Sequence, residues 1–408
     1  MMTPAEAAEA THQHIWQHFI HRDTQMFYDF DWRVHGRYLP TPEEIARGFP
    51  NRAGWCIGME NPALNAGQYL PAAVLRHQLG HDAASVDEAR LLFSGMKRLC
   101  DVAKAPGFLP RGVALDGASH YTNSSVDQIT MFLNGIFRYY ESDIPTEEEK
   151  QAIRQIWQNM LARWERDGWE DRTEDGQPAV NGDIGAITND RASRLLMALL
   201  GGAVVTGDEH WRRQYRQKLE EQDYARLKTG LPPSGASLYV FDQNQVAWRL
   251  LADLEDDPAI RQEYQARLAE TAAAVHGRLL AYQEFDPAEH SQRKAASDWD
   301  WRKAYDQTQT TPSLVSGKLR YTSAEQARER RLRLRKQQPV WWYEFWYVAE
   351  PFEAAHVLLL SGDAVSLDLL QSHLGPLFGA YPYEQLVLSW SLYGTESVYW
   401  LAVQAGLL

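Results

Sequence analysis

The chain has 408 residues, 44% of them hydrophobic and 23% charged, with a formal net charge of -13 at pH 7. This composition can bury a large core and fits no disordered, collagen-like or membrane class, while the negative charge argues against nucleic acid or an anionic membrane as a partner. The two cysteines, Cys56 and Cys100, are too few for a disulfide framework or a cysteine-based zinc site.

The first residues, MMTPAEAAEATHQHIWQHFIHRD, lack the basic and apolar regions of a secretory signal, and no apolar run reaches the length of a membrane span. We therefore expect a cytoplasmic protein.

Apolar periodicity and capping residues predict a succession of helices along the whole chain. The expected ranges are 4–22, 66–80, 85–104, 125–142, 146–166, 187–205, 209–225, 243–254, 257–283, 341–361, 363–373 and 384–406. Strand-like alternation is scarce and is limited to short stretches such as SLYVF at 237–241, so the class is all-α with at most small β decorations.

The connections between these helices alternate between short and long. Short turns with capping residues, such as SDIPTEEE and EDDPA, close successive helix pairs at a roughly regular interval, which is the signature of a repeat. The helices that follow long connections are apolar nearly all round, as in RLLMALLGGAVV, and should be buried, whereas their neighbours are amphipathic and belong outside.

Six inner and six outer helices in alternating order describe an (α/α)6 toroid, a single domain over residues 1–408. The range 284–340 is then a long insertion that we expect to fold over one end as a lid. A helical solenoid or an irregular bundle is the competing interpretation, because spacing alone does not demonstrate closure into a ring.

A toroid would gather the six long connections at the end where the inner helices begin. Their side chains are rich in carboxylates, amides, Trp and Tyr, which suits carbohydrate, because sugar hydroxyls pair with the polar groups and sugar rings stack on the aromatic ones. Paired carboxylates can also perform acid and base chemistry at a glycosidic bond.

Three carboxylates are the candidate catalytic residues: Asp127, Asp190 and Glu60. Asp127 and Asp190 each stand at the opening of an inner helix, where the helix dipole favours the ionised form. Asp127 could instead simply stabilise its helix start, and Asp190 could simply pair with Arg191 or Arg194. Glu60 lies in a loop, where acidic residues commonly serve turns.

A wider set of residues in the same connections is expected to bind the substrate. Trp299 and Trp301 would serve as a sugar platform on the lid, and Arg111 and Arg302 could grip a substrate carboxylate, although a structural ion pair would also explain either one. The set comprises Arg111, Asp116, His120, Tyr121, Asn123, Gln128, Asp183, Trp299, Trp301, Arg302, Trp342 and Glu344.

No HExxH pattern, P-loop or GxSxG elbow is present, so we expect no metal site and no cofactor. The helical plan and the phrases GMENPALNAGQYL, PGFLPRGV and YTNSSVDQ resemble the six-hairpin glycosidase superfamily, which includes unsaturated glucuronyl and rhamnogalacturonyl hydrolases. In those enzymes acidic residues at successive inner-helix openings act on the substrate, which by position corresponds to Asp127 and Asp190.

The resemblance implies a glycoside hydrolase that releases a terminal sugar, such as a uronic acid, from oligosaccharides. Three alternatives remain open: a polysaccharide lyase, a sugar epimerase that uses His120 or His356, and a non-catalytic glycan-binding protein.

Overall fold

Helices make up almost all of the regular structure. The computed structural model describes residues 2–51, 53–80, 84–179, 182, 184–185, 192–221, 231–232, 235–281, 284–304, 314–315, 318–319 and 335–408. The long helices are α1 (Pro4–His18), α4 (Pro62–Gly80), α5 (Ala84–Val102), α6 (Val126–Glu141), α7 (Glu147–Arg166), α8 (Ala192–Thr206), α9 (Glu209–Glu221), α11 (Leu238–Leu254), α12 (Pro258–Leu280), α13 (Pro287–Ala296), α16 (Glu350–Ser361), α17 (Ala364–Phe378) and α18 (Ser389–Gln404). The all-α class is confirmed, and every helix expected from the sequence is present, although several ends shift.

Two details of the expected elements were wrong. The SLYVF stretch is not a strand, because Leu238 begins α11 and the helix absorbs the rest of it. The helix expected over 341–361 is present but interrupted: α15 (Pro339–Glu344) passes through a π turn (Phe345–Ala349) into α16. Wide turns of this kind are frequent at functional sites.

Helices with all-round burial alternate with helices that bury one face. Nearly every residue of α6 and α8 is buried, whereas α7 buries a single stripe that includes Trp157 and Trp164. An apolar helix needs partners on all sides, and an amphipathic helix needs them on one. The buried helices accordingly pack against one another in chain order: α4 on α6, α6 on α8, α8 on α11, α11 on α16, α16 on α18, and α18 back on α4.

The closest of these helix contacts, between α4 and α6, is made by two glycines. A Cβ atom on Gly67 would lie 2.4 Å from the backbone of Met131, and one on Gly135 would lie 2.5 Å from the carbonyl oxygen of Gly67. Real side chains do not tolerate such distances, so the two backbones approach this closely only because neither residue has a side chain.

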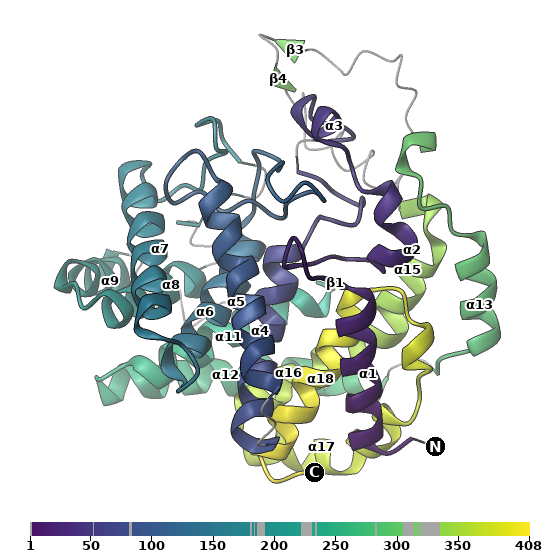
Figure 1. Cartoon of the computed structure of the whole chain (residues 1–408). Helices are drawn as coiled ribbons and strands as arrows, with labels where there is room; N and C mark the ends of the chain where they lie inside the picture. The colour runs from purple at the N-terminus through teal and green to yellow at the C-terminus, as the bar shows by residue number, and fades with distance from the viewer. Residues whose placement is uncertain are drawn as a thin grey trace.

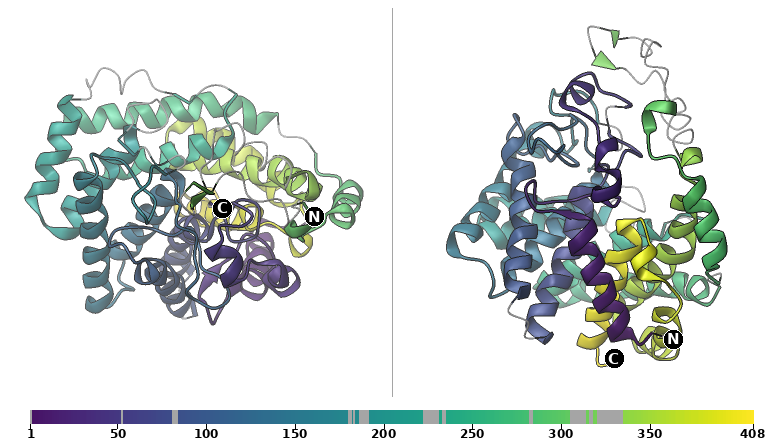
Figure 2. Two further views of the ribbon diagram at one scale, coloured as in Figure 1. Left: turned by 90° about the horizontal axis from the view of Figure 1, so that it is seen from above. Right: turned by 45° about the vertical axis from the view of Figure 1, so that its right-hand side comes forward.

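The connections into the buried helices gather at one end of the molecule. Figure 1 shows α3 (Pro42–Ala46) near the top and β1 (Ile20–His21) and α2 (Trp32–His35) at mid-height, all above the two chain termini, which lie at the bottom. Figure 2 repeats this separation of ends in a rotated view (right) and looks down on the connections (left). We call the end at which α4, α6, α8, α11, α16 and α18 begin the N-terminal face.

Sheet structure among the described residues is limited to two short antiparallel pairs. Strand β1 pairs with β2 (Met26–Phe27) so that Ile20 lies opposite Phe27, and β3 (Leu314–Val315) pairs with β4 (Lys318–Leu319). The first pair leads the chain from α1 to the N-terminal face. The second belongs to the insertion 284–340, which also contains α13 and the 3₁₀ turn η2 (Trp301–Ala304).

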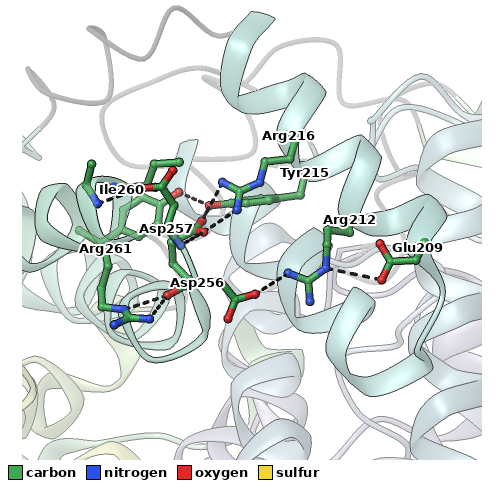
Figure 3. Close-up of polar contacts among 11 residues, drawn as sticks. Glu209, Arg212, Tyr215, Arg216, Asp256, Asp257, Ile260 and Arg261 are labelled. Carbon is green, nitrogen blue, oxygen red and sulfur yellow. Dashed lines mark hydrogen bonds and ion pairs between the residues drawn. The ribbon is translucent and has the colours of Figure 1, made fainter.

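The outer helices are fastened by polar contacts at their turns. Glu255 ends α11 and is fully buried; its carboxylate accepts hydrogen bonds from the hydroxyl of Tyr215 and, at 2.6 Å, from Nη2 of Arg216. Its own carbonyl oxygen accepts a 2.8 Å bond from Nε of Arg261 (Figure 3). A buried carboxylate needs such compensation, so this network joins α9 to the turn between α11 and α12.

A second buried carboxylate joins the two ends of the chain. Glu396 of α18 is fully buried and accepts a 2.6 Å hydrogen bond from the hydroxyl of Tyr69, and Nδ1 of His12 lies 3.2 Å from it. The other ring nitrogen of His12 lies 3.1 Å from Glu88 of α5. The helices α1, α4, α5 and α18 therefore share one polar cluster.

Within the described part of the chain, no helix combines the length and apolar character that a membrane span requires.

Candidate functional site

The first feature of the N-terminal face is an ion pair between two helix starts. Asp127 lies in the first turn of α6, and its Oδ1 accepts a 3.0 Å bond from Nη1 of Arg194 in the first turn of α8. The Arg194 side chain is 3% exposed and that of Asp127 is 33% exposed. The ion pair therefore holds the Asp127 carboxylate in one position while a third of it stays open to solvent.

A second group of carboxylates lies where the first long connection meets α4. Asp29 is buried and accepts hydrogen bonds from the backbone N–H of Glu60 at 2.6 Å and from Nδ2 of Asn65 at 3.1 Å. Burial and the charge of Glu60 raise the pKa of Asp29 to about 7. Oε2 of Glu60 accepts the N–H of Cys56 at 2.8 Å, so this pair is built into the loop structure.

Gln128 connects the starts of α4 and α6. Its Nε2 donates to Oδ1 of Asn61 at 2.9 Å, and its Oε1 accepts from the N–H of Leu64 at 3.0 Å. Arg111 reinforces the same junction, because its Nη1 donates to the carbonyl oxygen of Glu60 at 3.2 Å. Both residues therefore position the helix starts around Asp127 and Glu60.

One turn deeper, Asp242 of α11, Glu353 of α16 and Tyr393 of α18 come together with Asp29. We call these four residues the acidic cluster. Burial raises the pKa of Tyr393, and the charges of Glu353, Asp242 and Asp29 add to this effect. Three carboxyl groups on separate elements thus act electrostatically on one tyrosine.

Glu353 is the most perturbed carboxyl of this cluster. It is 7% exposed, and its Oε2 has no hydrogen-bond partner within the described residues. Burial, together with the charges of Glu350 and Asp242, raises the pKa of Glu353 well above its ordinary value. A raised pKa favours the protonated carboxyl, which can donate its proton, and this is the property required of a general acid.

Asp242 is held on both sides. One carboxylate oxygen accepts a 2.9 Å bond from Nε2 of Gln68, and the other pairs with Nδ1 of His356. All three side chains are buried. This layer of three residues lies across α4, α11 and α16, immediately beneath Glu353.

Aromatic side chains gather on the same face, at the starts of α11, α16 and α18. Trp346 is 48% exposed and stacks at 6.5 Å on Trp342, and Trp390 lies 5.9 Å from Tyr239. Exposed and half-buried indoles are flat apolar surfaces that can stack on sugar rings. Trp342 therefore has the surroundings expected of a platform residue.

The predicted residues of the second long connection mostly support the loop itself. Asp116 accepts bonds from the N–H groups of Ala118 and Ser119, so it closes a turn. Nε2 of His120 lies 3.1 Å from Glu174, and the hydroxyl of Tyr121 donates to the carbonyl of Phe49. Asn123 is buried. These contacts tie neighbouring connections together.

The predicted residues of the insertion also have partners within the protein. Trp301 is 2% exposed and donates from Nε1 to the carbonyl of Tyr38 at 2.8 Å, so its indole has no free face for a sugar. Arg302 makes a bidentate pair with Glu44, with both contacts at 2.6 Å. The segment thus packs on the first long connection, on the side of α2 and α3.

Trp299 and Glu344 likewise have partners in the protein. Trp299 stacks on His35 at 4.3 Å between ring centres. Glu344 is fully buried, and its oxygens accept bonds from the N–H groups of Val387 and Leu388 and lie 2.7 Å from Nε2 of His290. Glu344 therefore anchors the connection before α18. Asp183 and Asp190 lie outside the described residues, so their predicted roles stay predictions.

Sequence reasoning missed Asp29, Glu353, Tyr393 and Gln68. Glu353 stands inside the apolar run EPFEAAHVLLL, where a buried helix was expected and a polar site was not. One signal was present: Glu353 and His356 are three positions apart, a spacing that places both side chains on one face of a helix.

Among the residues that the structure describes, no three His, Cys, Asp or Glu side chains are arranged to hold a metal ion. Comparison of the chain with family models, with curated proteins and with solved structures gave no match, so the functional argument rests on the residues of the N-terminal face.

Proposed function

We propose that the protein is a glycoside hydrolase that removes a terminal sugar, of the uronic-acid type, from oligosaccharides at the N-terminal face. The observation that carries the proposal is Glu353, a buried carboxyl whose Oε2 has no hydrogen-bond partner among the described residues and whose pKa the charge of Asp242 helps to raise. Glycosidic bonds are cleaved by one carboxylic acid and one carboxylate acting together.

We propose further that the chain is a single (α/α)6 toroid. The packing of each buried helix on the next, with α18 returning to α4, supports a closed ring over a solenoid, whose ends do not meet. The alternation of buried and amphipathic helices supports an inner and an outer layer.

In the proposed reaction Glu353 donates its proton to the glycosidic oxygen as the bond to the anomeric carbon breaks. A water molecule adds to that carbon, and Asp127, held in position by Arg194, accepts the proton that the water loses. Asp242 is less suited to the role of base, because both of its oxygens are already occupied by Gln68 and His356. Asp190 and Glu60 remain candidates for assisting Asp127.

A uronic acid is proposed because its carboxylate needs a cation. Arg194 is buried at the start of α8 and its Nε has no hydrogen-bond partner within the described residues, so the guanidinium has donor capacity beyond its bond to Asp127. Trp342, Trp346 and Trp390 would stack on the sugar rings. Glu60, Gln128 and Arg111 would keep the helix starts in place.

The test is product analysis on oligosaccharides that end in glucuronic or unsaturated uronic acid. A hydrolase shortens the glycan with uptake of water, a lyase leaves an unsaturated sugar, an epimerase returns an isomer of the same length, and a binding protein changes nothing. Glu353→Gln should abolish hydrolysis, whereas Glu209→Gln, the same change at an exposed position of α9, should not. Unchanged hydrolysis in Glu353→Gln would exclude Glu353 as the acid.

A further inference from the structure

A cavity of ≈ 320 Å³ lies at the end of the buried helices opposite the N-terminal face. It is lined by the later turns of α4, α6, α11, α16 and α18, and the exposed residues Gln78, Glu141 and Gln404 stand at its rim. We call it the rear cavity. Because its rim residues are exposed final-turn residues, the cavity opens to solvent at this end.

The inner end of the rear cavity is polar. Gln68, Asn134, His356 and Ser397 line it, and each is at least nine-tenths buried. Asn134 makes no hydrogen bond to any described residue, although its amide can donate two and accept two. His356 uses Nδ1 toward Asp242, which leaves Nε2 for another partner.

Buried polar groups of this kind are normally satisfied, and those left open mark a place for a ligand or for ordered water. The amide of Asn134 and the imidazole of His356 both offer donor and acceptor capacity. A hydroxyl group, which donates one hydrogen bond and accepts others, matches both residues at once.

The walls of the rear cavity are aliphatic. Leu75, Met131, Val246, Leu359 and Leu401 contribute to them, and among the described residues the imidazole of His356 is the only aromatic ring in the lining. Sugar rings are held by stacking on Trp or Tyr, so these walls suit an aliphatic body better than a sugar. They also distinguish the rear cavity from the N-terminal face, where indoles gather.

The charges at the rim cancel. Nη2 of Arg138 lies 2.7 Å from one oxygen of Asp253, Nε of Arg249 lies 3.0 Å from the other, and Arg138 also pairs with Glu141 at 3.2 Å. Two cations and two anions that bind each other leave no net charge for an ionic ligand. The volume is at the lower end of the range of about 300–1,000 Å³ found for small-molecule sites.

We propose that the rear cavity is a second binding site, for one uncharged small molecule with a hydroxyl-bearing head and an aliphatic body. The head lies against Asn134 and His356, and the body lies along Leu75, Met131 and Leu359. The site goes beyond the glycan chemistry proposed above, and its test measures binding directly, so it does not depend on that activity.

Hexane-1,2-diol is a suitable probe, with toluene as a purely apolar comparison and glucose as a purely polar one. Titration calorimetry on the full chain should show saturable binding of the diol and weaker binding of both comparison compounds. The diol should also raise the melting temperature in a concentration-dependent way.

Two substitutions locate the probe. Asn134→Leu removes the open amide and should weaken diol binding about tenfold, the loss of one to two hydrogen bonds. Leu75→Trp, at a half-buried wall position, fills the cavity and should abolish binding. Asn159→Leu makes the same change as Asn134→Leu on the outer helix α7 and should leave binding unchanged. If Asn134→Leu does not fold, Ser397→Ala takes its place and should also weaken binding.

Three outcomes would overturn the proposal. In the first, the diol does not bind the wild-type protein. In the second, it binds Leu75→Trp with the same affinity as the wild type. In the third, toluene binds more tightly than the diol, and Asn134→Leu does not change which of the two compounds binds more tightly. The last result would mean that the cavity is merely an apolar space.

Discussion

Arg194 holds Asp127 across the boundary between α6 and α8: their contact at 3.0 Å joins the two helix starts, with the cation buried and the carboxylate a third exposed. The guanidinium fixes the position of the Asp127 carboxylate, and the carboxylate compensates a buried cation, which would otherwise be costly.

Asp127→Asn should reduce turnover of a uronic-acid-terminated oligosaccharide by about 10²–10⁴-fold, the usual contribution of a general acid or base. The amide nearly preserves the shape, so the loss of stability should stay at about 1 kcal/mol, the strength of a weakened ion pair with a partly exposed partner. Turnover and the melting temperature, measured on one preparation, check both. Asp143→Asn, an exposed change at the opposite end, is the control. Near-normal turnover of a folded Asp127→Asn variant would leave Asp127 a purely structural role.

Glu353→Gln should remove activity without loss of stability at neutral pH. The pKa of Glu353 is raised in the folded protein, so its carboxyl contributes stability fully below the unfolded pKa near 4.5 and loses this contribution as the pH rises through the folded value. Glutamine stays neutral throughout. Melting curves from pH 5 to 9 should therefore show the variant gaining on the wild type as the pH rises. Parallel curves would contradict the raised pKa.

Deprotonation of His12 should reduce the stability of the fold at alkaline pH. Burial lowers its pKa, but the hydrogen bonds and charges of Glu396 and Glu88 outweigh this effect and raise the pKa to about 9 from 6.5. The protonated ring therefore stabilises the fold fully below pH 6.5, by roughly 3 kcal/mol, and this contribution is lost as the pH rises through 9. Denaturant titrations of wild type and His12→Gln at pH 6 and pH 9.5 measure it. The wild type should be the more pH-sensitive of the two.

Two glycine-to-alanine substitutions should have opposite effects. Gly67→Ala drives a methyl group into the backbone of Met131 and should cost at least about 1–3 kcal/mol, because α4 and α6 would have to separate. Gly277→Ala in α12 meets no atom within 4 Å, and alanine is the better helix former, so it should stabilise by about 0.5–1 kcal/mol. Equal effects in chemical denaturation would show that α4 and α6 do not meet as closely as described.

The helices could be predicted because helix formation and helix burial depend on the pattern of residues within one short stretch of sequence. RLLMALLGGAVV and EEEKQAIRQIWQNMLARWERD differ in periodicity, and that difference alone places one helix inside and the other outside. The place of Asp127 at a helix start could be predicted for the same reason, since a carboxylate that precedes an apolar helical run is visible in the sequence. Its partner could not: Arg194 was weighed as a partner for Asp190, four positions before it, whereas the structure pairs it with Asp127 on another helix.

The acidic cluster could not be predicted, because its members are distant in sequence and each has an ordinary explanation alone. Asp29, Asp242 and Glu353 lie on three connections or helices, and only the packing of α11, α16 and α18 brings them to Tyr393. The prediction for Trp301 was wrong for the opposite reason. Its polar and aromatic sequence neighbours indicated a binding platform, but its indole donates to the carbonyl of Tyr38, and the adjacent Arg302 pairs with Glu44.

The direction of protein synthesis affects when α1 can pack on α17 and α18. The helix α1 is synthesised long before α17 and α18, yet it packs on both of them, and His12 meets Glu396 across a separation of 384 residues. The backbone contact between Asp29 and Ser389 is equally late. During translation the apolar face of α1 therefore stays without these partners until α17 and α18 have been made. Contacts between residues so far apart in sequence also form slowly. A release assay on stalled nascent chains should find Asp29 and Tyr393 brought together only after α18 has left the exit tunnel, so that the proposed acid–base site forms only once α18 has packed on the earlier helices.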